Sequence, residues 1–297
     1  MRILSFGSLN IDHVYKVDHI VNEGETMDSY DYQVFPGGKG LNQSIALSRA
    51  GATVFHAGNI GKDGQWLIKL LEENRADCVY TRVANVNTGS AFIQVAANGQ
   101  NSIVLNGGAN RCNTKESIDE VLDNFSEGDF LLLQNEINLI DYIIDRAYEK
   151  KMFIVFNPSP MNENVEKCAL WKISLFILNE TEGKQITGQD EQALVLIEMN
   201  RLFPKARIVL TLGEEGAMYK DGDQILQHPA CNVQVVDTTG AGDTFTGFFI
   251  SAMMQEYSID ECLRIASQAA ALSVTRPGAA ASIPYMEEVK KTEHGEN

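Results

Sequence analysis

Short apolar runs alternate with amphipathic ones along most of this chain, and this alternation limits the folds that it can adopt. Six runs are typical of buried strands, at residues 3–6, 53–57, 130–134, 153–156, 175–178 and 208–212. Between them, apolar residues recur with helical spacing at residues 41–50, 64–74, 139–150 and 192–202. Strands that alternate with helices form a mostly parallel sheet with helices on both faces. We therefore predict an α/β fold around one central sheet.

Two segments interrupt this alternation. Residues 11–35 and 87–105 resemble pairs of short strands, with turn residues at 22–24 and 98–100. Both hairpins would leave the main sheet at the edge where open α/β folds bind ligands. We therefore predict a small β-sheet lid over a site, and the alternative is a pair of surface hairpins without a role.

The domain boundaries follow from these segments. The predicted lid comprises residues 11–36 and 87–105, and the main domain comprises residues 1–10, 37–86 and 106–290. Residues 291–297 are polar, and we expect them to form a frayed tail.

The composition excludes several classes of protein. A net charge of −16 leaves little basic surface, so neither nucleic acid nor an anionic membrane is expected as a partner. No apolar run is long enough to span a bilayer and no secretory leader is recognisable, so we expect a cytoplasmic protein. The five cysteines are never in C-x-x-C spacing, which argues against disulfides and zinc and favours buried thiols.

Residues 236–245 change from a strand-like run into a Gly-rich turn and then into a helix that carries one acid, Asp243. The turn places Gly240, Ala241 and Gly242 at the amino end of that helix, where free N–H groups and the helix dipole attract anions. We predict a phosphate cradle with Asp243 beside it as a base. The alternative is a tight turn followed by an ordinary first-turn acid. Neither G-x-x-x-x-G-K-[ST] nor G-x-G-x-x-G occurs, so the better-known phosphate loops are excluded.

Polar residues follow other predicted strands. Asn10 and Asp12 come after the first strand, as ligands or as turn formers. Three glycines crowd the helix start at residues 35–43, which suggests that backbone there approaches a ligand and that Asn42 contacts it. Asn179 and Glu182 are spaced either as a capping box or to hold hydrated Mg²⁺, and both roles are compatible.

Taken in this order, the motifs around residues 37–43 and 237–243 resemble those of the ribokinase family of sugar kinases, also called the phosphofructokinase-B family. The resemblance covers the chain to about residue 290 and implies the ribokinase-like fold. It implies transfer of phosphate from ATP to a sugar hydroxyl, with Mg²⁺, and K⁺ as an activating ion. The implied sugar contacts are Asn10, Asp12, Gly38, Lys39, Asn42 and Glu136.

The resemblance also assigns the other ligands. The implied nucleotide and Mg²⁺ contacts are Asn179, Glu182, Thr211, Gly213, Gly216 and Gly242. Ser267 stands near the adenine, where family members usually carry Asn or His, so this sequence departs from the pattern there. The implied monovalent-cation loop comprises Asp237, Thr239, Ser273, Arg276, Gly278 and Ser282, mostly through carbonyl oxygens.

The expected substrate is a small free sugar. Residues 83–110 hold no Lys or Arg, and residues 11–36 hold only Lys16, which disfavours a phosphorylated sugar. The acceptor-rich set of implied sugar contacts favours D-ribose, with ribose 5-phosphate as product. Deoxyribose, fructose or a nucleoside is the alternative, and lid aromatics such as Tyr15, Tyr32, Phe35 and Phe92 could stack on a nucleobase. A non-catalytic sugar sensor is a further alternative. The open lid edges suggest a homodimer formed through the lid.

Overall fold

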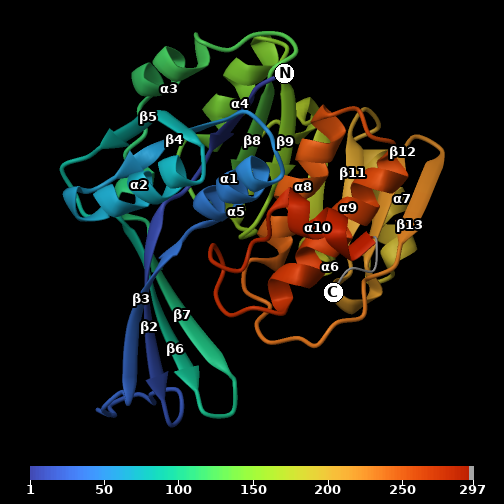
Figure 1. Ribbon diagram of the computed structural model, residues 1–297. Helices are drawn as coiled ribbons and strands as arrows, with labels where there is room; N and C mark the ends of the chain where they lie inside the picture. The colour runs from blue at the N-terminus through green and yellow to red at the C-terminus, as the bar shows by residue number, and fades with distance from the viewer. Residues whose placement is uncertain (294–297) are drawn as a thin grey trace.

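The computed structural model describes residues 1–293 and shows an α/β fold with two sheets (Figure 1). Within these residues, nine strands form the main sheet in the order β13-β12-β11-β10-β9-β8-β1-β4-β5. The strands from β5 to β11 pair in parallel, and β12 and β13 extend one edge in antiparallel fashion. The predicted fold class is confirmed. The strands are β1 (Ile3–Phe6), β4 (Val54–Ile60), β5 (Asp77–Val83), β8 (Phe130–Gln134), β9 (Phe153–Asn157), β10 (Leu175–Asn179), β11 (Arg207–Thr211), β12 (Ala217–Asp221) and β13 (Gln224–His228).

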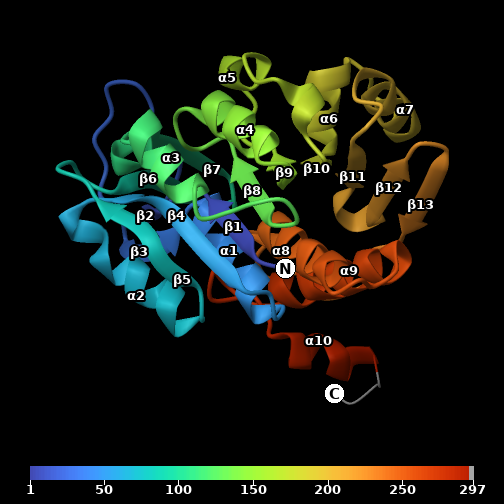
Figure 2. The same ribbon diagram turned by 90° about the horizontal axis from the view of Figure 1, so that it is seen from above.

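Helices cover both faces of this sheet, which makes three layers (Figure 2). One face carries α1 (Lys39–Arg49), α2 (Gln65–Glu73), α8 (Ala241–Met254), α9 (Ile259–Val274) and α10 (Met286–Glu293). The other face carries α3 (Lys115–Leu122), α4 (Ile140–Glu149), α5 (Glu163–Glu166), α6 (Glu180–Thr187) and α7 (Gln192–Leu202). Short 3₁₀ turns lie at η1 (Lys62–Gly64), η2 (Gly108–Arg111), η3 (Leu170–Lys172) and η4 (Gly213–Glu215).

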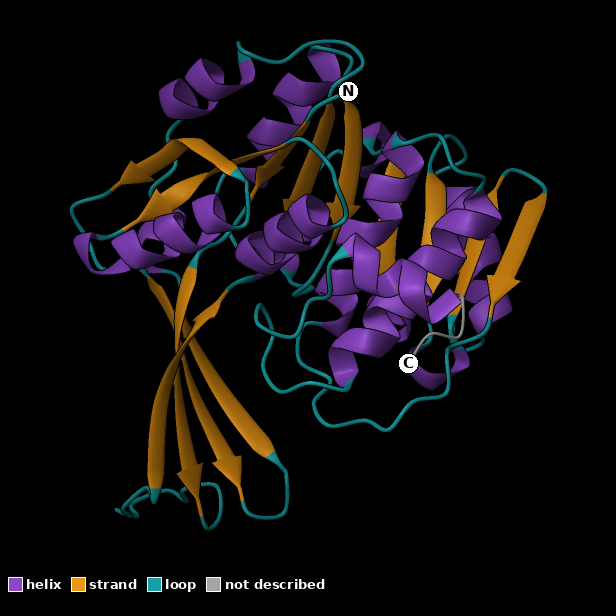
Figure 3. Ribbon diagram, viewed as in Figure 1, coloured by secondary structure: helices purple, strands orange, loops and turns teal. Residues whose placement is uncertain are grey.

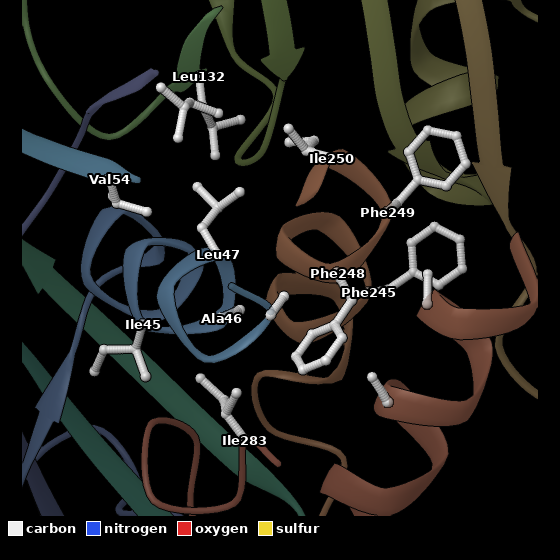
Figure 4. Close-up of a cluster of buried hydrophobic side chains, with 14 of the residues drawn as sticks. Ile45, Ala46, Leu47, Val54, Leu132, Phe245, Phe248, Phe249, Ile250 and Ile283 are labelled. Carbon is white, nitrogen blue, oxygen red and sulfur yellow. The ribbon is translucent and has the colours of Figure 1, made fainter. Parts of the chain in front are cut away.

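The central strands are buried on both faces, because successive side chains of a strand point to opposite sides. Ile3 and Leu132 pack into the cluster under α1 and α8, whereas Leu4 and Leu131 pack under α3 and α4. Figure 4 shows the first cluster, in which Leu47 of α1 lies between Leu132 and the phenylalanines of α8. A Cβ at Gly247 would lie 2.4 Å from the Cβ of Ala46, so a glycine in α8 is what allows the two helices to pack this closely.

The second sheet protrudes from the main body (Figure 3). In the described chain it consists of the four strands β3 (Asp31–Gly37), β2 (Asn10–Val17), β6 (Gly89–Ala96) and β7 (Asn101–Asn106), in that order. Two antiparallel hairpins, β2–β3 and β6–β7, are joined by the parallel pair β2–β6. The predicted small sheet of two hairpins is confirmed.

Several predictions about the chain need correction. The expected tail begins inside α10, which continues to Glu293, and residues 294–297 lie outside the described part of the chain. Cys78 and Cys262 are buried as expected, but the other three cysteines are only partly buried, and the five are free thiols.

None of the helices in residues 1–293 is long and apolar enough to cross a membrane.

Candidate active site

Two neighbouring cavities lie where β9, β10 and β11 end. The first has a volume of about 330 Å³, and its lining includes the last residues of those strands, Asn157, Asn179 and Thr211. The second has a volume of about 590 Å³ and shares Thr211, Gly213 and Gly242 with the first. The carboxyl ends of parallel strands are where open α/β folds bind ligands, so we treat the pair as the candidate active site.

Asp243 lies in the first turn of α8 and lines the first cavity, with 7% of its surface exposed. Its Oδ2 atom accepts a hydrogen bond from Nδ2 of Asn42 at 2.9 Å, and its Oδ1 atom accepts one from Nε2 of Gln43 at 2.9 Å. A carboxylate has about four acceptor sites, so Asp243 can still accept a further proton donor from the cavity. This is the arrangement that a general base requires.

The amino end of α8 has the backbone of an anion site. Gly240 is the N-cap with φ of 77°, in the left-handed region that favours glycine, and a Cβ there would lie 3.1 Å from Ala279. The N–H groups of Gly242 and Asp243 have no acceptor among residues 1–293. Ala241 differs from the expectation, because its N–H donates to the carbonyl of Thr238 at 3.2 Å. Only part of the predicted cradle is therefore free to bind phosphate.

Lys39 supplies the positive charge of the first cavity. Burial alone would lower the pKa of Lys39, but attraction to Asp243, Glu136 and Glu182 outweighs this and raises the pKa. The backbone N–H of Lys39 donates to Glu136 at 3.0 Å, and the hydroxyl of Ser8 donates to the same carboxylate. Lys39 therefore stays positively charged beside the proposed base.

The other predicted sugar contacts gather at the start of α1 and the base of the lid. A Cβ at Gly38 would lie 3.0 Å from the carbonyl oxygen of Ser8 and 3.1 Å from the backbone nitrogen of Asn10, so glycine is needed where these segments meet. The Oδ1 atom of Asn10 accepts a hydrogen bond from Nδ2 of Asn110 at 2.7 Å, which fixes its side chain. Asp12 lies opposite Phe35 in the lid sheet, next to this cluster.

Asp12 has an unusual environment. Burial and, second, the charge of Glu136 raise its pKa to about 7. Its Oδ1 atom is buried and has no partner in the described chain, and the same is true of Oδ1 of Asn42. Buried polar atoms are nearly always paired, so these two acceptors indicate a ligand that brings hydroxyl groups.

Asn179 and Glu182 form the predicted capping box at the start of α6. The side chain of Asn179 accepts from the backbone of Glu182 at 2.9 Å, and Glu182 accepts from both the backbone and the side chain of Asn179. Both residues line the first cavity together with Asn157, whose buried Oδ1 atom has no partner in residues 1–293. Carboxylate and amide oxygens facing one cavity suit a hydrated divalent cation.

The second cavity has mostly apolar walls. Its lining includes Gly216, whose φ of 100° and close approach to the backbone of His228 require glycine, and Ser267, which is 6% exposed. The hydroxyl of Ser267 is buried and has no partner in the described residues. A mostly apolar slot with a buried free hydroxyl suits a planar base, and Thr211, Gly213 and Gly242 connect it to the phosphate cavity.

Asp237 joins two loops behind the anion site. Its Oδ1 atom accepts from the backbone and hydroxyl of Thr239 at 2.9 and 2.6 Å, and its Oδ2 atom accepts from the backbone of Gly278 at 2.8 Å. Burial would raise the pKa of Asp237, but these donors outweigh it and lower the pKa. The structure thus brings together three of the six residues of the predicted cation loop, Asp237, Thr239 and Gly278.

The remaining residues of that loop have other side-chain partners. The hydroxyls of Ser273 and Ser282 donate to the carbonyls of Ala270 and Ala279, and Arg276 pairs with Glu288 at 2.6 Å. The guanidinium of Arg276 cannot bind a cation, so these three residues could offer one only carbonyl oxygens and the hydroxyl oxygens of the two serines. Among residues 1–293 no group of three His, Cys, Asp or Glu side chains could hold a metal ion, so a cation here would rely on carbonyl, amide and water oxygens.

Four residues of the site were missed. Gln134 and Asn157 end strands at the ligand-binding edge, so the rule that identified Asn179 could have found them. Gln43 stands within the Gly-rich motif but had no assigned role. Asn110 lies in a 3₁₀ turn, and no local pattern marks it.

Comparisons with known proteins agree with this geometry. A family model described as pfkB family carbohydrate kinase matches residues 1–286. The ribokinase of Haemophilus influenzae is 36% identical over 294 residues and 95% of each chain, and the deoxyribokinase of Salmonella typhi is 30% identical over 297 residues and 97% of each chain. The structure of Arabidopsis thaliana ribokinase complexed with ribose and ATP has a TM-score of 0.85, 29% identity, and coverage of 98% of this chain and 97% of that one. Because the family model and a relative above 30% identity both span nearly the whole chain, this protein belongs to the pfkB family of carbohydrate kinases.

Proposed function

We propose that this carbohydrate kinase transfers the γ-phosphate of ATP to the primary hydroxyl of D-ribose and forms ribose 5-phosphate. The observation that carries the proposal is the position of Asp243, which is held by Asn42 and Gln43 at the free amino end of α8. A general base and an anion site on consecutive residues suit attack of a hydroxyl on a phosphate. We place the reaction in the cytoplasm, where ATP is available.

The sugar end favours a free sugar. The unpaired acceptors of Asp12 and Asn42 would each accept a hydroxyl, and Glu136 lies beside them. Lys16, the one cation in the lid segments 11–36 and 87–105, pairs with Asp31 at 3.2 Å. A phosphorylated sugar would therefore find no free cation at the lid.

The proposed chemistry uses the residues of the first cavity. Asp243 takes the proton of the sugar hydroxyl as the oxygen attacks, and the N–H groups of Gly242 and Asp243 and the ammonium of Lys39 stabilise the charge on the phosphate oxygens. Mg²⁺ would be held through Glu182 and Asn157, where it supplies charge neutralisation for the phosphates. K⁺ would be held by carbonyls of the loops that Asp237 joins.

The nucleotide is proposed to be ATP, with its base in the second cavity and its phosphates in the first. The apolar wall would cover the base, and the unpaired hydroxyl of Ser267 would be the polar contact to it. Relatives of the same length include a ribokinase solved with ATP, which supports this donor.

A second substrate, deoxyribose, is favoured by the similarity to the Salmonella typhi deoxyribokinase. A nucleoside is less well supported, because strand register places Tyr15, Tyr32 and Phe92 on the face of the lid opposite to Asp12. Only Phe35, which pairs with Asp12, shares its face.

The test is ATP consumption by the purified chain with ribose, deoxyribose, fructose and a nucleoside, each with and without K⁺. We expect the highest kcat/KM with ribose, then deoxyribose. A higher kcat/KM with deoxyribose than with ribose would identify deoxyribose as the preferred substrate. If none of these compounds stimulates ATP consumption, the proposal is contradicted and a sugar sensor is favoured.

We also propose a homodimer formed through the lid. The face opposite to Asp12 carries His13, which stacks on Phe92 at 5.0 Å, and Tyr15, which stacks on Tyr32 at 4.8 Å. Phe92 and Tyr32 remain 43% and 48% exposed. An exposed aromatic face on an open sheet suits a second copy of the same surface.

A further inference from the structure

The two amides that hold Asp243 differ in their other contacts. Oδ1 of Asn42 has no partner, as a sugar ligand requires. Oε1 of Gln43 instead accepts a hydrogen bond from Nε2 of Gln134 at 2.7 Å. Gln43 and Gln134 are 1% and 0% exposed, and neither lines a cavity, so contact with the substrate does not explain them.

The direction of these hydrogen bonds follows from chemistry. An ionised carboxylate only accepts, so the NH₂ group of Gln43 must face Asp243 and its oxygen must face away. That oxygen is buried and needs a donor, which Gln134 supplies. Without Gln134, that oxygen would be buried without a donor, and the side chain of Gln43 would no longer be held in the orientation that directs its NH₂ group at the carboxylate.

Gly7 makes room for this arrangement at the end of β1. A Cβ at residue 7 would lie 2.3 Å from Oε1 of Gln134 and 2.6 Å from Cα of Gly40. The side chain of Gln134 therefore packs directly against the Gly7 backbone, which limits its freedom to rotate away from Gln43. Three elements far apart in the chain, β8, α1 and α8, thus meet in one buried series of amides that ends on Asp243.

We propose that Gln43 and Gln134 are positioning residues that fix the direction of the Asp243 carboxylate toward the sugar hydroxyl. The inference rests on the proposed role of Asp243 as the base. Neither residue lines a cavity, so losing the hydrogen bond between them should affect the rate of transfer more than sugar binding. Misplacement of a reacting group by about 1 Å can cost about 100-fold in rate, so a small rotation of the carboxylate is sufficient.

The test is Gln134→Met, which keeps the length of the side chain and removes the donor. We expect kcat with ribose to fall about 10- to 100-fold while KM for ribose stays within about threefold. The matched control is Asn59→Leu, which keeps the shape of its side chain, because Asn59 is also buried and also donates to another amide, Asn113, at 2.6 Å. It should lose similar stability and keep its kcat within about threefold. If Gln134→Met does not fold, Gln134→Asn withdraws the donor while keeping an amide.

The same substitution is repeated in an Asp243→Ala background. We expect Gln134→Met to have no further effect on kcat there, because the group that it positions is absent. Three results would overturn the inference. The first is an unchanged kcat in Gln134→Met, and the second is an equal fall in kcat in the Asn59 control. The third is a fall of the same size when Gln134→Met is added to Asp243→Ala. If Asp243→Ala alone leaves kcat unchanged, the proposed function fails instead, so the two failures are distinguishable.

Discussion

The side-chain amide of Asn42 donates to Asp243 across 2.9 Å, although the two residues are 201 positions apart in the chain. The contact depends on the close packing of α1 against α8, which Gly247 permits. The free oxygen of Asn42 is an acceptor for the sugar. One side chain therefore contacts the proposed base and, as proposed, the substrate whose proton that base removes.

The phosphate site is tested by two glycines of one turn. A Cβ at Gly242 meets nothing within 4 Å, so Gly242→Ala should fold and gain about 0.5–1 kcal/mol from better helix propensity. The methyl group would occupy the cavity, so KM for ATP should rise at least tenfold. Gly240→Ala should instead lose about 1–2 kcal/mol, because its φ is 77°. Urea unfolding and ATP kinetics distinguish the two, and a Gly242→Ala variant with native KM would contradict the placement of phosphate.

The raised pKa of Asp12 predicts how the stability of the fold depends on pH. Its pKa is raised to about 7 in the folded state, so between pH 4 and 7 the folded chain holds a proton that the unfolded chain has released. The stability from this group is present at low pH and lost as pH rises through 7. Asp12→Asn stays neutral and avoids that loss, so its stability relative to the wild type should increase from pH 5 to pH 8. Urea unfolding of both proteins without ligands checks this, and a constant difference across the range would contradict the prediction.

The cation loop is tested at Asp237. Asn at this position would turn an NH₂ group toward the N–H of Gly278 or of Thr239, so Asp237→Asn should separate the two loops. We expect the K⁺ concentration for half-maximal activation to rise about tenfold, with KM for ribose unchanged, because loss of a hydrogen bond to a charged group costs roughly 1.5–3 kcal/mol. The control is Asp223→Asn, an exposed acid in the β12–β13 turn. A K⁺ response identical to that of the control would show that this loop holds no activating ion.

The lid dimer is tested at Val104, which is 64% exposed. Val104 pairs with Phe92 and therefore lies on the face of the lid opposite to Asp12. Val104→Asp places a charge in the proposed interface and should convert a dimer to a monomer at micromolar concentration in sedimentation velocity. Gln33→Asp, on the other face of the lid, should remain dimeric. A monomeric wild type, or a reversal of these two results, would contradict the proposed interface.

The central fold could be predicted from the sequence because fully buried strands are uniformly apolar, as in Leu131, Leu132 and Leu133 of β8. The edge strands β5 and β13 were missed for the opposite reason. Val79 in β5 and Ile225 in β13 are 68% and 49% exposed, so these strands lack a continuous apolar run. Pairing with a neighbour, which local patterns do not reveal, makes them strands.

The residues of the candidate active site also fall into two groups, those that a local pattern marks and those that only tertiary packing brings together. Asp243, Gly240 and the Asn179–Glu182 pair were identified because a local turn or cap marks them. Gln134 reaches Gln43 across 91 positions of sequence, and such a contact exists only once β8 and α1 are packed. The occupied N–H of Ala241 was likewise unpredictable, because it depends on how the turn closes onto Thr238.

The most direct measurement compares ribose-dependent ADP formation by the wild type and by Asp243→Asn and Asp243→Ala, with ribose affinity measured by calorimetry. Loss of a general base typically costs about 10²- to 10⁴-fold, so we predict a fall in kcat of that size in both variants. Ribose affinity should stay within about threefold, because Asp12, Asn42 and Glu136 remain in place. Near-native turnover in either variant would contradict the account.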